Sequence, residues 1–92
     1  MILLDIIATL DRFDDGDTIY CREPWTRNSV ALVAPEPESG GLPSEADRLG
    51  LRYFLEIELA KDLIASWAGS AGVKPSVEQQ CDRVIAYAEN DA

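Results

Sequence analysis

Three glutamates, Glu23, Glu56 and Glu58, are the candidates for acid–base chemistry in this chain. A pair of carboxylates can hydrolyse a glycosidic bond when a cleft holds the two groups at the correct separation. A domain of 92 residues has little material from which to build such a cleft. The alternating position of Glu56 among aromatic residues favours another role, as an ion-pair partner of Arg22 or Arg52 on the face of a sheet.

Histidine is absent from the chain, and this excludes many enzyme mechanisms. Without an imidazole there is no Ser–His or Cys–His nucleophile and no histidine ligand for a metal. The two cysteines, Cys21 and Cys81, are too few for a zinc site of four thiolates. Both fall at positions that we expect to face the core, so we interpret them as small buried hydrophobic residues. We therefore expect a protein that is not an enzyme and that uses no cofactor and no metal.

One acidic segment, residues 11–23, invites comparison with a calcium-binding loop. With Gly16 as the invariant glycine, three aspartates fall at positions that supply ligands. Phe13 and Arg22, however, occupy two other ligand positions, and neither side chain can bind calcium. We interpret this segment as a solvated turn that ends the first helix.

The charge balance is strongly acidic, because eight Lys and Arg oppose seventeen Asp and Glu to give a net charge of −9 at pH 7. A nucleic-acid binder needs cations to displace the counterions of phosphates, and an anionic membrane would repel this chain. We expect neither nucleic acid nor membrane as a partner, whereas an acidic surface suits solubility or a basic protein partner. The apolar start of the chain is interrupted by Asp5 and lacks the basic residues of a secretion signal, so we expect a cytoplasmic protein.

The first part of the chain is expected to form a helix and two strands that would position these residues. Apolar residues recur at helical spacing over residues 2–12, and β-forming residues fill 18–22 and 29–34. Neighbouring residues of the first strand, such as Cys21 and Arg22, would point to opposite faces. The second strand is apolar on both faces, so we expect it to be either central in the sheet or covered.

The last part of the chain begins with a segment that fits both a strand and a helix. Aromatic residues dominate its first half and helix formers its second, so we predict a strand over 52–57 and a helix over 58–69. Ser76 and Gln79 form a capping box, and the apolar spacing behind it predicts a last helix over 76–89.

A loop rich in proline and glycine, residues 35–43, separates these two parts of the chain. Residues 44–50 predict one helical turn, with Ser44 as its N-cap and Gly50 as its end. The assembled prediction is a single domain over residues 1–92 of the α+β class. It has a small three-stranded antiparallel sheet with helices packed on one face, in the order α-β-β-β-α-α.

The face of the sheet away from the helices is expected to be partly wet, aromatic and charged. Trp25 lies beside it in the connection between the first two strands, and either contacts a partner or folds back over the open end of the sheet. Trp67 falls on an apolar helix stripe and is expected in the core. Tryptophan, tyrosine and arginine dominate binding hot spots. The candidate partner surface therefore consists of Tyr20, Arg22, Glu23, Trp25, Arg27, Phe54 and Glu56.

Two segments, "TIYCREPW" at 18–25 and "GLRYFLEIELAKDLIASW" at 50–67, resemble a family of small acidic bacterial proteins. Members of that family share an "IYxREPW" segment and a "YFLEVxxAKEFLxxW" segment. The resemblance covers most of the chain and implies one domain. The family is a domain of unknown function, so the resemblance assigns no catalytic residue.

Three functions from different classes are compatible with these features. The first is a non-enzymatic protein-binding module, similar to an immunity protein or an inhibitor, whose partner is basic. The second is a structural domain that associates with itself as a homodimer. The third is a small hydrolase or ligand binder that uses Glu56 and Glu58. We favour the first because the net charge is −9, histidine is absent and the chain is short.

Overall fold

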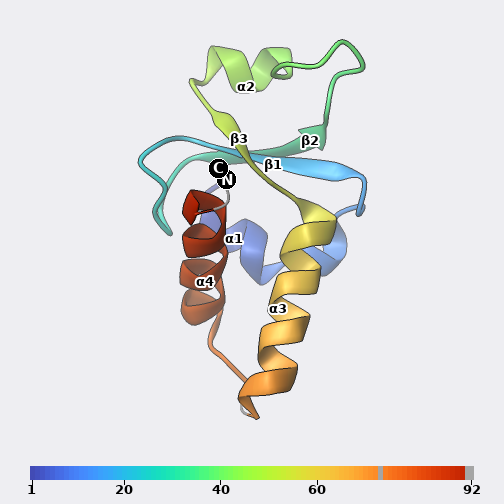
Figure 1. Ribbon diagram of the computed structural model, residues 1–92. Coiled ribbons are helices and arrows are strands. Elements are labelled where there is room, and N and C mark those ends of the chain that lie inside the picture. The colour runs from blue at the N-terminus through green and yellow to red at the C-terminus, as the bar shows by residue number, and fades with distance from the viewer. Residues whose placement is uncertain (73, 91–92) are drawn as a thin grey trace.

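A computed structural model describes residues 1–72 and 74–90 of the chain (Figure 1). Its elements, in chain order, are α1 (Leu3–Ala8), the 3-10 helix η1 (Leu10–Arg12), β1 (Asp17–Cys21), β2 (Ala31–Pro35), α2 (Ser44–Arg48), β3 (Arg52–Glu56), α3 (Ile57–Ala71) and α4 (Val77–Asn90). The α+β class and the three-stranded antiparallel sheet are as predicted, with the short α2 inserted between the second and third strands. In the described part of the chain, no helix is long and apolar enough to cross a membrane.

The sheet has β1 in its centre, with β2 on one side and β3 on the other. Both neighbours run antiparallel to β1, and Ile19 lies opposite Val33 of β2 and Leu55 of β3. We predicted that β2 is either central in the sheet or covered. It is an edge strand, and both of its faces are covered. Ala31 packs in the cluster on one face, and Leu32 packs against the cluster on the other.

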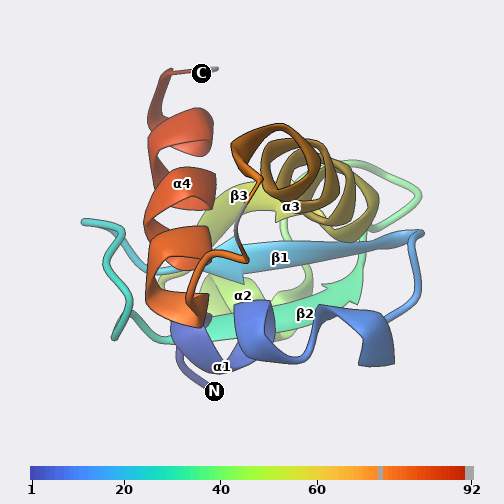
Figure 2. The ribbon, with the colours of Figure 1, turned by 90° about the horizontal axis from the view of Figure 1, so that it is seen from below.

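Helices α1, α3 and α4 all lie on one face of the sheet (Figures 1 and 2). The side chains between them and the sheet form the main core, in which every member is less than a tenth exposed. Its members are Leu3, Ile6, Ile7, Leu10, Ile19, Cys21, Ala31, Phe54, Leu55, Ile57, Ala60, Cys81, Val84, Ile85 and Ala88. Because they come from the first helix, all three strands and the last two helices, the main core unites the whole chain.

Helix α2 lies on the opposite face of the sheet, above β1 and β3 in Figure 1. Beneath it Tyr20, Ala46 and Leu51 form a second, smaller cluster, against which Leu32, Leu49 and other partly buried residues pack. The expectation that helices cover one face only was therefore wrong. The short segment after the proline-rich loop is long enough to reach back over the sheet and remove Tyr20 from water.

Strand β3 contains a β-bulge, which changes the side to which its residues point. Ile19 pairs with Leu55 and Tyr20 pairs with Tyr53, so that Phe54 is an extra residue on β3. Phe54 and Leu55 consequently both pack in the main core, while the ring of Tyr53 meets that of Tyr20 edge to face at 6.5 Å. The prediction that Phe54 lies on the outer face was wrong, because it assumed strict alternation along the strand.

The starts of α4 and α2 illustrate one correct and one wrong prediction of a cap. At α4 the backbone N–H of Gln79 donates to Ser76 Oγ at 3.1 Å, and that of Ser76 donates to Gln79 Oε1 at 2.9 Å. This is the predicted capping box. At α2 the N-cap is Pro43 and Ser44 is already helical. Ser44 therefore makes no side-chain cap, because the helix begins one residue earlier than expected.

Candidate functional site

The seven residues predicted to form one partner surface are distributed over three different environments. Tyr20 is 1 % exposed in the second cluster and Phe54 is 2 % exposed in the main core, so neither can contact a partner. Glu56 is exposed at the end of β3, next to Glu58 in the first turn of α3. These two carboxylates line none of the three surface hollows described below.

Arg22 and Glu23 both make contacts within the protein. The guanidinium of Arg22 donates to the carbonyl of Leu49 at 2.7 Å and so ties the end of β1 to the segment that follows α2. Glu23 lies 3.9 Å from Arg52, with both side chains more than half exposed. An exposed pair at that distance contributes little stability. The predicted ion pair of Glu56 with Arg22 or Arg52 was wrong, because Arg22 donates to the carbonyl of Leu49 and Arg52 pairs with Glu23.

Trp25 is half-buried and is held in place from two directions. Its indole N–H donates to the carbonyl of Cys21 at 3.3 Å, and its ring meets that of Phe54 edge to face at 4.9 Å. An edge-to-face pair of this kind adds about 0.5–1.5 kcal/mol beyond the burial of its area. Trp25 thus packs on the rim of the main core, and part of its ring remains accessible. The two interpretations of this residue are compatible with one another.

Arg27 connects the same loop to helix α4 through a two-pronged ion pair with Asp82, and the loop runs beside that helix (Figure 2). Arg27 Nε donates to Asp82 Oδ1 at 2.8 Å and Nη2 donates to Oδ2 at 2.6 Å. Hydrogen bonds from Arg27 lower the pKa of Asp82, and the same bonds raise the pKa of Arg27. Paired donors of this type fix orientation as well as contributing energy, so the loop has a defined position on α4.

A hollow of about 420 Å³, the loop-side hollow, opens between this loop and α4. Its lining combines the ring of Trp25 and the side chain of Ile85 with the charged groups of Arg27, Asp82 and Glu89. The complete lining is Trp25, Thr26, Arg27, Asn28, Asp82, Ile85, Ala86 and Glu89. The hollow therefore has an apolar base and a charged rim.

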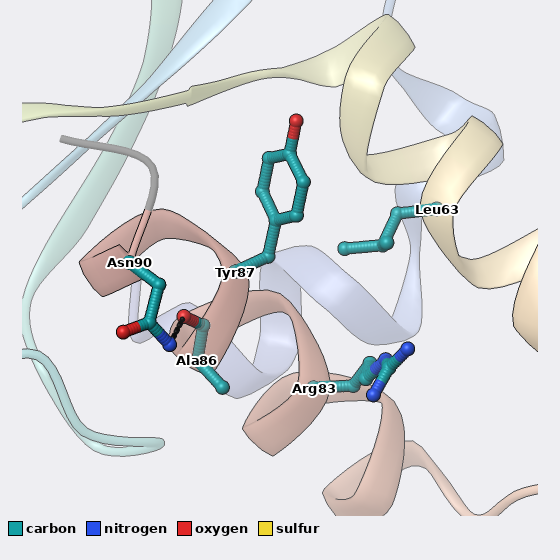
Figure 3. A pocket seen from close by; sticks show the side chains of 5 residues that line it. All are labelled: Leu63, Arg83, Ala86, Tyr87 and Asn90. Carbon is teal, nitrogen blue, oxygen red and sulfur yellow. Dashed lines mark hydrogen bonds between the residues drawn. The ribbon is translucent and has the colours of Figure 1, made fainter.

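A second hollow of about 320 Å³, the α3-side hollow, lies on the other side of α4. Figure 3 shows Leu63 of α3 and Tyr87 and Arg83 of α4 around it, and Asn90 turned back to donate to the carbonyl of Ala86 at 2.8 Å. The guanidinium of Arg83 also lies 5.6 Å from the ring centre of Trp67. Trp67 is only half-buried, so the prediction that it belongs to the core was wrong. It lies on α3 where that helix faces α4.

Ala86 is exposed on α4 and lines both hollows. We define the α4 surface as Ala86 together with the linings of the loop-side and α3-side hollows. Of the predicted surface residues it retains Trp25 and Arg27, and it adds a half of α4 that was not predicted. The one sequence signal for the added half was Tyr87, a large aromatic residue that falls outside the apolar stripe of that helix.

A third hollow of about 380 Å³ lies between α1, α3 and the start of α4. It is lined by both lysines of the chain, Lys61 and Lys74, beside apolar residues such as Ile7 and Ile64. Lys61 is already engaged, since its Nζ donates to Asp15 Oδ1 at 2.7 Å and to the carbonyl of Phe13 at 3.0 Å. These bonds fasten the turn before β1 to α3, which is a structural role.

The two cysteines confirm their interpretation as small buried hydrophobic residues. Cys21 and Cys81 are free thiols with no exposed surface. Burial raises the pKa of each to about 11, so both remain protonated at neutral pH and are poor nucleophiles. Among the described residues, no group of three or more carboxylates and thiols is arranged to hold a metal ion.

Comparisons with known proteins add no functional information: no protein-family model, no curated protein and no solved structure matches this chain. The resemblance of residues 18–25 and 50–67 to a family of unknown function therefore stays a prediction. The α4 surface is the candidate site that the geometry itself provides.

Proposed function

We propose that this protein is a non-enzymatic protein-binding module and that its α4 surface docks a basic protein partner. The observation that carries the proposal is the position of Ala86, a small exposed residue between two hollows, with Trp25 on one side and Tyr87 on the other. A partner could lie across the helix at this point and place one side chain in each hollow. Large aromatic residues beside a small one supply the shape that a docking surface requires.

The composition of the α4 surface supports this proposal. Tryptophan, tyrosine and arginine are the residue types that contribute most to binding energy at protein interfaces. Trp25, Tyr87, Arg27 and Arg83 all line the two hollows. Protein interfaces are also open and shallow more often than small-molecule pockets are, and both hollows lie on the surface of a helix.

The anchoring of these residues lowers the entropic cost of binding. Trp25 is fixed by its contacts with Cys21 and Phe54, and Arg27 by its two bonds to Asp82. Ordering a mobile side chain at an interface costs about 0.5–1.5 kcal/mol, and a side chain that is already fixed avoids most of this cost. The α4 surface is to this extent preorganised.

The charge of the chain decides which kind of partner we propose. A net charge of −9 attracts cationic proteins over long distances and speeds their association at low salt. The α4 surface itself carries charges of both signs, so charge alone would give the fast encounter, and the apolar and aromatic contacts would hold the complex.

Self-association through the sheet is the competing function, and β3 is one of the two edge strands that could mediate it. This edge strand is short, begins and ends with the charged residues Arg52 and Glu56, and contains the bulge at Phe54. Each of these features discourages pairing with another strand. The α4 surface is therefore a better candidate for contact than the β3 edge of the sheet.

The test is to immobilise the protein and capture partners at low salt from an extract of the cells that produce it. The variant Ala86→Arg places a long side chain between the two hollows, and Ala65→Arg makes the same change at an exposed position of α3 as the control. We expect a basic protein that the wild type and Ala65→Arg retain, that Ala86→Arg loses at least tenfold, and that salt releases. Equal retention by both variants, or no basic partner, would overturn the proposal.

Sedimentation at micromolar concentration separates this proposal from self-association. We expect a species of 10.1 kDa for the wild type and for both variants. A dimer that Ala86→Arg converts to monomer would show that the α4 surface binds a second copy of the chain, and would overturn the proposal of a basic partner.

A further inference from the structure

One charged side chain of the loop-side hollow, Glu89, has no ion-pair or hydrogen-bond partner among the described residues. Arg27 and Asp82 neutralise each other through two hydrogen bonds. The third charged group of the lining is Glu89, which is exposed. Within residues 1–72 and 74–90, its carboxylate forms neither an ion pair nor a hydrogen bond. The hollow is thus lined both by one unpaired negative charge, that of Glu89, and by the half-buried indole of Trp25.

From this arrangement we infer that the loop-side hollow binds an arginine side chain of the partner. The inference rests on the proposed function and names the chemistry that the partner must present. A guanidinium is planar, so that it can stack on the ring of Trp25, and its paired N–H groups match the two oxygens of the Glu89 carboxylate. Ile85 and Ala86 would contact the methylene groups of the same side chain.

Two contacts inside the molecule already use the same chemistry around α4. On the other side of the helix, the guanidinium of Arg83 lies 5.6 Å from the ring centre of Trp67. In the hollow itself, Arg27 binds the carboxylate of Asp82 with two nitrogen atoms. A partner arginine would combine these two contacts, one with Trp25 and one with Glu89. Lysine fits less well, because its ammonium group is not planar and cannot bind a carboxylate with two parallel bonds.

The charge of the hollow also favours a cation over an anion. Its lining contains one cationic and two anionic side chains, Arg27 against Asp82 and Glu89. The remaining negative charge has the same sign as the net charge of the chain. The hollow and the whole molecule therefore attract the same kind of group, which is the complementarity that a basic partner requires.

The experiment titrates the protein with Nα-acetyl-arginine amide and follows the Trp25 indole N–H by NMR. Nα-acetyl-citrulline amide, which has the same shape without the charge, is the matched ligand. The variants are Glu89→Gln and the control Glu58→Gln, which removes the same charge from an exposed position on α3. Both substitutions keep the size of the side chain and lie at exposed sites, so we expect both variants to fold.

We expect the arginine amide to shift the Trp25 signal saturably and to bind at least fivefold more tightly than the citrulline amide. Glu89→Gln should abolish this preference and Glu58→Gln should leave it intact. Equal binding of the two ligands, equal loss in the two variants, or shifts that map away from Trp25 and Glu89 would each overturn the inference.

The outcome is independent of the capture experiment that tests the proposed function. A basic partner that Ala86→Arg loses but Glu89→Gln retains would support the docking surface and overturn the arginine site. Conversely, selective binding of the arginine amide without any captured partner would support the arginine site while the proposed function fails.

Discussion

The two faces of the sheet are covered in contrasting ways. On one face, α1, α3 and α4 enclose the main core, to which every strand contributes. On the other face, the five-residue helix α2 has a single buried residue, Ala46, and of the proline-rich loop Leu42 packs against the same cluster. The α4 surface stands on the first face, since Trp25 packs on Phe54 of the main core. The contrast indicates that the candidate surface derives its rigidity from the main core and not from the second cluster.

The two faces also differ in how well their buried polar groups are hydrogen-bonded. The indole N–H of Trp25, at the rim of the main core, has the carbonyl of Cys21 as its acceptor. The hydroxyl of Tyr20, in the second cluster, is buried and forms no hydrogen bond of good geometry in the described part of the chain, although the Thr18 side chain is close enough to interact with it. A buried polar group left in this condition costs about 1–3 kcal/mol. The second cluster is thus less well satisfied as well as smaller.

Removing a side chain from the main core is expected to have the largest effect. Leu3→Ala should lower the free energy of unfolding by about 2–5 kcal/mol, because it leaves a cavity among fully buried neighbours. Urea denaturation measures this change. Leu59→Ala, at a position that is 38 % exposed, is the control and should cost less than about 0.5 kcal/mol. Similar losses of unfolding free energy in Leu3→Ala and Leu59→Ala would show that the main core is not the principal source of stability.

Lifting α2 should have a smaller and more local effect. Ala46→Glu forces a carboxylate into the second cluster, and we expect α2 to detach at a cost of about 1–2 kcal/mol. Hydrogen exchange should then accelerate for residues 44–51 and remain unchanged in α4. Ser44→Glu, which adds the same group at an exposed position of α2, should change neither. Loss of protection in α4 would mean that the two faces are coupled.

Removing the buried hydroxyl of Tyr20 should stabilise the protein, in contrast to the two substitutions above. Tyr20→Phe keeps the ring and deletes the unpartnered group, so we expect the free energy of unfolding to rise by as much as about 1 kcal/mol. Thermal unfolding compares it with Tyr87→Phe, whose hydroxyl belongs to a half-buried side chain of the α4 surface and should matter little. A loss of stability in Tyr20→Phe would show that the hydroxyl has a partner, for which the Thr18 side chain is the candidate.

Acid should break the contact between Arg27 and Asp82 and so release the loop of Arg27 from α4. Of the four changes, this one should affect the stability of the fold least. The pKa of Asp82 is lowered below its ordinary value of 3.8 by the hydrogen bonds from Arg27. The bond to Arg27 therefore contributes fully above pH 3.8 and is lost as the pH falls further, through the lowered pKa. The Trp25 indole N–H signal should follow this transition in an NMR titration. Asp82→Asn should lack the transition, and an unchanged titration in that variant would assign it to another group.

Local features of this fold could be predicted because neighbouring residues cause them. The capping box of Ser76 and Gln79 starts α4 as expected, since both partners lie within one turn. The change from strand to helix near residue 57 was also predicted, because the composition itself changes there. The positions of Tyr20 and Phe54 could not be predicted, because one depends on α2 and the other on an extra residue in β3.

The candidate site was predictable only in its first half. Trp25 and Arg27 stood out as residue types that bind proteins, and both line the loop-side hollow. Glu89, Arg83 and Tyr87 lay on a helix whose polar side looked like ordinary solvated surface. Their role in the α4 surface depends on where the loop and α3 meet that helix, and contacts between separate elements determine this.

By itself, the sequence determined the α+β class, the elements in their approximate places, the acidic charge and the absence of histidine chemistry. These properties follow from composition and from spacing within a few residues, where local conformational preference and side-chain periodicity act. Tertiary structure alone decided which face of the sheet is closed, which aromatic rings are buried and which surface remains for a partner. Such outcomes depend on contacts between distant segments, as between Arg27 and Asp82, whose free energy arises only when the folded chain brings them together.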